Sequence, residues 1–130
     1  MKREAVFSSK GPKPKGIYSP AMRAEGSLVF VSGQGPIDPA TNEMVLGDFR
    51  QQAELTFRNV GILLEAAGTS WEHVVKVNVY LTDPGDFAAM NDIYKGFFKA
   101  PYPARTTVGT AMVAPGMLIE VDCIALVPGK

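Results

Sequence analysis

The sequence has only one cysteine and one histidine among its 130 residues. One cysteine cannot form a disulfide within the chain, and the two residues together are too few for the usual zinc sites. No apolar run approaches the roughly 18 residues of a membrane-spanning helix, and the first sixteen residues lack the apolar stretch of a secretory signal. We therefore expect a cytoplasmic protein that holds no metal and has no membrane partner.

An excess of charge of one sign is also missing, because thirteen basic residues balance thirteen acidic residues and the isoelectric point is about 6.6. Five basic residues lie within the first fifteen positions, which is typical of a solvated terminal arm. Proteins that bind nucleic acid usually carry a strong positive field, so the overall balance argues against nucleic acid as a partner.

Glycine and proline are in excess, with 13 and 10 copies. They gather in three short stretches, at Gly11–Gly16, Gly33–Pro39 and Pro101–Pro103. This distribution predicts tight, defined loops rather than a flexible linker. With 46% hydrophobic residues and no internal repeat, the chain is expected to form a single domain over residues 1–130.

The spacing of apolar residues predicts a first helix over residues 49–67. Asp48 and Gln51 are three residues apart, as in a capping box, and precede apolar residues that recur every three or four positions. Gly68 follows directly and is suited to end the helix.

A second helix is expected after Asp83-Pro84, because proline is favoured at the first helical position and an apolar stripe runs from 87 to 98. The predicted strands cover residues 5–7, 28–31, 74–81, 106–112 and 118–127. This order predicts an α+β domain in which both helices lie on one face of a mixed sheet.

The last predicted strand, 118–127, is apolar on both faces. Two helices cover only one face of a sheet, so the other face needs a second cover, and we infer that other subunits supply it. The strand also carries Glu120 and Asp122, which lie two residues apart and therefore share a face.

Glu120 and Arg105 are the charged residues that most need an explanation. A carboxylate on a partly buried strand reaches solvent, meets a cation, or serves as a positioned base or hydrogen-bond acceptor. Arg105 can grip a carboxylate through two parallel hydrogen bonds, or it can be a surface residue or the internal partner of Glu120. The residue types alone leave these alternatives open.

Other polar residues give weaker signals. Asn91 lies four residues after Phe87, on or beside an apolar stripe, where its amide must bridge backbone or contact a ligand. The backbone of Ser32–Gly35 could bind an oxyanion, although it lacks a phosphate-loop motif. His73 and Cys123 are expected to be structural, and no cofactor fingerprint is present.

Taken together, several stretches resemble the Rid family of reactive-intermediate deaminases, also called the YjgF family. The resemblance extends in order over nearly the whole chain, and its pieces are Tyr18-Ser19-Pro20-Ala21, Phe30-Val31-Ser32-Gly33-Gln34, Glu65-Ala66-Ala67-Gly68, Val77-Asn78-Val79-Tyr80-Leu81, Phe87-Ala88-Ala89-Met90-Asn91-Asp92-Ile93-Tyr94, Pro103-Ala104-Arg105-Thr106-Thr107-Val108 and Ile119-Glu120-Val121.

The resemblance implies a fold like that of bacterial chorismate mutase and a homotrimer with sites between subunits. It implies that Arg105 binds a substrate carboxylate and that Glu120 holds or activates a water. Gly33, through its backbone, and Tyr18 would line the cleft, and Asn91 would support it.

The implied reaction is the cofactor-free hydrolysis of 2-aminoacrylate and related enamines, through their imine tautomers, to 2-oxo acids and ammonia. Thr107 stands where many active members carry cysteine. Either this position contacts substrate through its main chain, or the missing thiol changes the substrate range. The departure therefore bears on substrate choice and leaves Arg105 in place.

Three alternatives stand beside this reaction. The substrate could be a larger one, such as 2-aminomuconate. The same cleft could bind a small 2-oxo acid for regulation, without chemistry. The ribonuclease or translation-inhibitor activity of some relatives is disfavoured by the neutral net charge and the single histidine.

Overall fold

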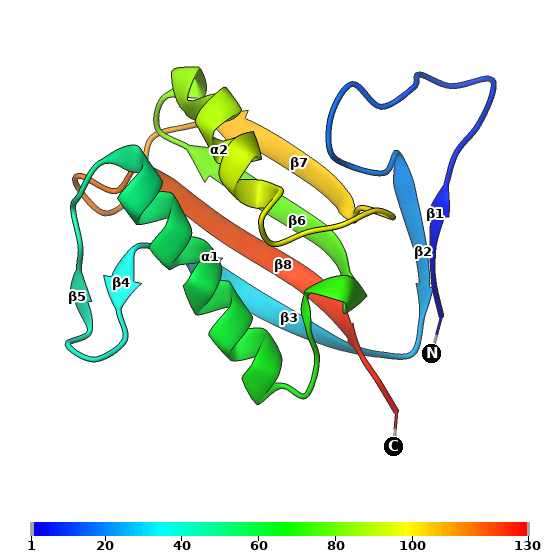
Figure 1. The fold of residues 1–130 in the computed structure, drawn as a ribbon, viewed down its shortest axis with the longest axis horizontal. Helices are drawn as coiled ribbons and strands as arrows, with labels where there is room; N and C mark the ends of the chain where they lie inside the picture. The colour runs from blue at the N-terminus through cyan, green and yellow to red at the C-terminus, as the bar shows by residue number, and fades with distance from the viewer. Residues whose placement is uncertain (1, 130) are drawn as a thin grey trace.

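The centre of the computed structural model, which describes residues 2–129, is a four-stranded mixed sheet in the order β3-β8-β6-β7. The strands are β3 (Ser27–Gln34), β8 (Ile119–Val127), β6 (Val74–Leu81) and β7 (Ala104–Gly109). β8 is antiparallel to both β3 and β6, whereas β7 is parallel to β6. Two helices, α1 (Phe49–Ala66) and α2 (Phe87–Tyr94), lie on one face of the sheet (Figure 1). The predicted α+β architecture is confirmed.

Smaller elements surround this sheet. Two two-stranded ribbons and two single-turn helices are present: β1 (Lys2–Val6) with β2 (Ala21–Glu25), β4 (Ile37–Asp38) with β5 (Glu43–Met44), η1 (Trp71–His73) and η2 (Pro84–Asp86). The β1–β2 ribbon stands beside the N-terminal ends of β6 and β7 (Figure 1). Of these elements only β1 had a predicted counterpart, at 5–7, because the others are too short or too polar to show a period.

The first helix forms as predicted, and its ends are fixed locally. Gln51 N donates to Asp48 Oδ1 and Asp48 N donates to Gln51 Oε1, each at 2.9 Å, which completes the capping box. Gly68 has a φ of +82°, in the region that favours glycine, and the helix ends just before it.

The second helix is shorter than the sequence predicts. It ends at Tyr94, and the chain then turns through Phe97 and Phe98, whose amides both donate to the Tyr94 carbonyl. Both rings pack on Trp71, with centroids 5.1 and 5.0 Å from it. The apolar stripe over 87–98 was therefore wrongly interpreted as continuous helix, because its last two aromatic residues belong to a tertiary cluster.

The hydrophobic core lies between the helices and the sheet. Alternate residues of β6 and β8 face it, and these are almost fully buried: Val77, Val79, Leu81, Ile119, Val121, Cys123 and Ala125. The alternation predicted for both strands is confirmed. The opposite face of the sheet carries exposed apolar side chains, with Phe30 69% and Leu28 47% accessible.

The last two strands differ from their predicted bounds and are not neighbours. β7 begins at Ala104, two residues earlier than predicted, and ends at Gly109. β6 lies between β7 and β8, so the turn that joins them does not form a hairpin. Arg105 therefore lies within an edge strand instead of in the turn before it. Within residues 2–129, no helix has the length and apolar character to cross a membrane.

Candidate functional site

Arg105 projects toward the helical layer. It is paired with the buried Val77 of the parallel strand β6, so both side chains point to the same side of the sheet. Its guanidinium lies 4.8 Å from the centroid of the Tyr94 ring and 5.7 Å from that of Phe87. Burial lowers the pKa of Arg105, and no carboxylate within residues 2–129 lies within 4.0 Å of its side-chain nitrogens. The cation is therefore available to an external anion.

Several buried polar atoms beside Arg105 lack a hydrogen-bond partner. They are Asn91 Oδ1, Tyr94 OH, Thr107 Oγ1 and one guanidinium nitrogen, Nη1, of Arg105 itself. Asn91 and Tyr94 are three residues apart on α2, and Arg105 and Thr107 are two apart on β7, so each pair shares a face. Buried polar groups are normally paired. This concentration of unpaired atoms indicates a place where water or a ligand binds.

Tyr18 is held at the same end of β7. The next residue, Ser19, donates its amide to Pro103 O at 3.1 Å and its hydroxyl to Tyr102 O at 2.5 Å. Burial is the largest influence on the pKa of Arg105 and lowers it, whereas Tyr94 and, to a smaller extent, the Tyr18 phenol raise it, so Tyr18 lies close enough to act on the guanidinium. The structure thus brings four of the predicted residues, Tyr18, Asn91, Arg105 and Thr107, to one region, which we call the arginine half-site.

Glu120 lies on the other face of the sheet. It is paired with Tyr80 across β6 and β8, and Gly33 lies beside it where β3 bulges between Val31 and Gln34. A Cβ atom at Gly33 would overlap Glu120 Oε2, so a larger residue there would displace the carboxylate from this position. We call Gly33 and Glu120 the glutamate half-site.

Asp122 is bound by its neighbours, whereas Glu120 is not. Asn78 Nδ2 donates to Asp122 Oδ1 at 2.8 Å, and Tyr80 OH donates to Asp122 Oδ2 at 2.9 Å. The hydrogen bond between Tyr80 and Asp122 is the main reason that the pKa of Tyr80 is raised. Among the described residues, Glu120 has no side-chain hydrogen bond or ion pair. Asp122 therefore stabilises the sheet, and Glu120 is left without a side-chain partner among the described residues.

Arg105 and Glu120 do not meet within one chain. Arg105 shares the face of Val77, and Glu120 shares the opposite face with Tyr80 and Asp122. The sequence-based alternative in which Arg105 is the internal partner of Glu120 is therefore wrong. Residues within 2–129 line cavities of about 440, 450 and 220 Å³, and neither Arg105 nor Glu120 belongs to the lining of these three.

The other candidate groups do not form a nucleophile or a metal centre. Cys123 is buried, and burial raises the pKa of its thiol to about 12, so it stays protonated at neutral pH. Among residues 2–129, no group of three or more histidine, cysteine, aspartate or glutamate side chains is placed to hold a metal ion.

We expect Gly33→Ala to lower turnover about 10- to 100-fold, because its methyl group displaces the Glu120 carboxylate and small misplacements of a reacting group are costly. Gly129→Ala is the matched control, since a methyl group there meets no atom within 4 Å. Steady-state rates of both variants, with thermal melts to confirm folding, test this. Wild-type turnover by Gly33→Ala would mean that the carboxylate position does not matter.

Sequence reasoning missed two parts of the arginine half-site. Phe87 and Tyr94 flank Asn91 at spacings of four and three on α2, and both rings contact the Arg105 guanidinium. Both were interpreted only as core residues of an apolar stripe. Their spacing from Asn91 was the available signal, because it places an amide between two aromatic rings on one helix face.

Comparisons with known proteins show what the whole chain is similar to. The model of the family named Endoribonuclease L-PSP matches residues 8–127. A RutC family protein of Pyrococcus abyssi is 45% identical over 125 residues, which cover 96% of this chain and 98% of that one. The 2-iminobutanoate/2-iminopropanoate deaminase of Dermatophagoides farinae is 40% identical, over 96% of this chain and 97% of that one. The crystal structure of RidA from an Antarctic Psychrobacter superposes with a TM-score of 0.73 at 40% identity, over 95% of this chain and 99% of that one.

Proposed function

We propose that this chain, which belongs to the Rid family and matches the Endoribonuclease L-PSP model, hydrolyses reactive 2-imino acids to 2-oxo acids and ammonia. The observation that carries this is the unpaired Arg105 guanidinium, set among buried polar atoms that also lack partners. Such a group fits the carboxylate of a small acid. A relative at 40% identity named as an imine deaminase supports the same chemistry.

The chemistry needs orientation and proton transfer from the protein. An enamine such as 2-aminoacrylate tautomerises to 2-iminopropanoate, whose imine carbon is already electrophilic. Water adds its oxygen to that carbon, and Glu120 accepts a proton from this water and passes it to the nitrogen. Glu120 then moves the hydroxyl proton of the resulting carbinolamine to its nitrogen, the C–N bond breaks, ammonia leaves and the C=O bond forms. Arg105 holds the carboxylate throughout, so that the water and imine carbon stay aligned.

The complete site requires two chains, because each chain holds Arg105 and Glu120 on opposite faces of its sheet. We propose a homotrimer in which Arg105 of one subunit and Glu120 of the next face the same cleft. The exposed Phe30 and Leu28 lie on the face that carries Glu120 and would be covered by this assembly. We expect the trimer to act in the cytoplasm, without a cofactor and without a nucleic-acid or membrane partner.

The test measures release of ammonia and pyruvate from 2-aminoacrylate, generated in situ by a serine dehydratase. We expect the wild-type protein to raise this rate above the spontaneous rate in proportion to its concentration. If the protein does not accelerate this release, the proposed deaminase activity toward small imino acids is refuted. If it accelerates only the hydrolysis of 2-aminomuconate, the larger molecule is its substrate.

A regulatory binding module is the second candidate, because the arginine half-site can hold a 2-oxo acid whether or not Glu120 reacts. In that case pyruvate or 2-oxobutanoate would bind at Arg105 while the imine hydrolysed at its spontaneous rate. Calorimetry beside the rate assay separates the two functions.

A further inference from the structure

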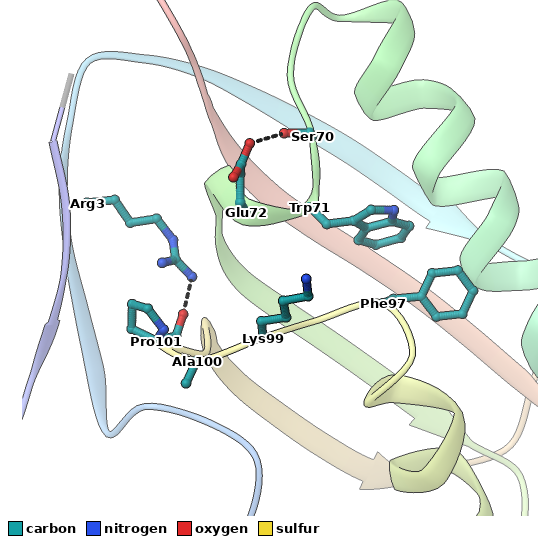
Figure 2. Close-up of a pocket in the computed structure, with 8 residues that line it drawn as sticks. All are labelled: Arg3, Ser70, Trp71, Glu72, Phe97, Lys99, Ala100 and Pro101. Atoms are coloured by element: carbon teal, nitrogen blue, oxygen red, sulfur yellow. Dashed lines mark hydrogen bonds between the residues drawn. The ribbon is translucent and has the colours of Figure 1, made fainter.

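A cavity of about 440 Å³ has no role in the proposed reaction. It opens between β1, η1 and the loop after α2, and Figure 2 shows its lining: Arg3, Ser70, Trp71, Glu72, Phe97, Lys99, Ala100 and Pro101. None of these residues belongs to the arginine or glutamate half-site.

One wall of the cavity is a fixed aromatic surface. The Trp71 indole packs against Phe97 and Phe98, and a Cβ atom at Gly61 of α1 would come within 2.9 Å of it. Helix α1 and the two phenylalanine rings of the loop after α2 therefore hold the indole in place. A fixed, partly accessible indole offers a stacking surface to an apolar or aromatic ligand at little cost in side-chain entropy.

Two cations line the cavity without an acidic partner. Arg3 Nε donates to Val74 O at 2.7 Å and Nη2 donates to Pro101 O at 2.9 Å, so backbone carbonyls orient the guanidinium without neutralising its charge. Burial lowers the pKa of Arg3, and no carboxylate within residues 2–129 lies within 4.0 Å of Arg3 or Lys99. Figure 2 shows the Lys99 side chain directed into the space bounded by Arg3, Glu72 and Trp71.

Glu72 does not cancel these charges. Its carboxylate accepts a hydrogen bond from Ser70 Oγ at 3.2 Å and lies 3.7 Å from His73 Nε2, and its side chain is 78% accessible. It thus stands at the solvent side of the cavity, bound to its own segment. The net charge of the residues that line the cavity is therefore positive.

We propose that this cavity binds a small aromatic carboxylate, with the carboxylate between Arg3 and Lys99 and the ring against Trp71. The two unpaired cations select an anion, and the indole wall selects a ring over a bare anion such as acetate. The ligand would join β1 to the loop after α2, so its binding would also raise the thermal stability of the chain. This inference is independent of the proposed deaminase function.

The experiment uses the intrinsic fluorescence of Trp71, which is the only tryptophan of the sequence. Phenylacetate is titrated into the wild-type protein, with benzylamine and acetate as matched probes of charge and ring. We expect a saturable change in fluorescence with phenylacetate and none with the other two. No saturable change, or an equal change with acetate or benzylamine, would overturn the proposal.

Three variants show where phenylacetate binds. Lys99→Gln should raise the dissociation constant of phenylacetate about tenfold, because it removes one charged hydrogen-bond donor. Lys95→Gln, which alters an exposed lysine outside the cavity lining, should leave it unchanged. Arg105→Lys should also leave it unchanged. If Arg105→Lys alone abolished the signal, the ligand would occupy the arginine half-site and the cavity proposal would fail while the proposed function stood.

Discussion

Arg105→Lys is expected to lower kcat/KM for 2-iminopropanoate about 100-fold or more. A lysine ammonium cannot form two parallel hydrogen bonds to the substrate carboxylate, and it cannot replace the planar group that lies against Tyr94 and Phe87. Ammonia release, corrected for the spontaneous rate, gives the kinetic constants, and a thermal melt confirms that the variant is folded.

Arg50→Lys is the matched control for this variant. Arg50 is exposed on α1 and pairs with Asp92 at 3.1 Å, so the same change of side chain there should leave kcat/KM within about twofold of wild type. Near-normal turnover by Arg105→Lys would remove the proposed carboxylate-binding role. Equal losses in both variants would point to general damage instead.

Glu120→Gln is expected to lower kcat about 100- to 1000-fold while a 2-oxo acid still binds with nearly wild-type affinity. The amide keeps the size of the side chain beside Gly33 but cannot accept a proton from water. Rates come from the ammonia assay and affinities from calorimetry with pyruvate. Lost binding with intact turnover of bound substrate would show that Glu120 is structural.

Asp122→Asn serves as the control for Glu120→Gln on the same strand. It weakens the hydrogen bonds from Asn78 and Tyr80, so we expect a stability loss of about 1–3 kcal/mol with turnover per folded molecule preserved. A lowered kcat in the folded Asp122→Asn protein would mean that the reacting carboxylate extends beyond Glu120.

Mixed trimers of Arg105→Lys and Glu120→Gln subunits test whether the site is shared between chains. If Arg105 of one subunit works with Glu120 of the next, every mixed trimer regains one intact site. Random assembly of equal amounts then recovers about a quarter of wild-type activity. No recovery after mixing and reassembly would place both residues of each site in the same chain.

Much of the secondary structure could be predicted because its signals are local. Asp48, Gln51 and Gly68 fixed α1 through caps that involve only neighbouring residues. Val74–Leu81 was predicted with its observed bounds, because period-two alternation needs no partner to be recognised. The end of α2 was missed because Phe97 and Phe98 pack against Trp71, a contact that spans more than twenty residues.

The charge balance, the family resemblance and the choice of Arg105 and Glu120 as candidate residues follow from the amino-acid sequence alone. Their placement on opposite faces of the sheet follows from strand pairing in the folded chain. The face of a strand residue depends on which strand it pairs with and in which register, and β6 supplies the register for both β7 and β8. Those pairings join residues 28 and 40 positions apart, Val77 with Arg105 and Tyr80 with Glu120, so no local pattern contains them.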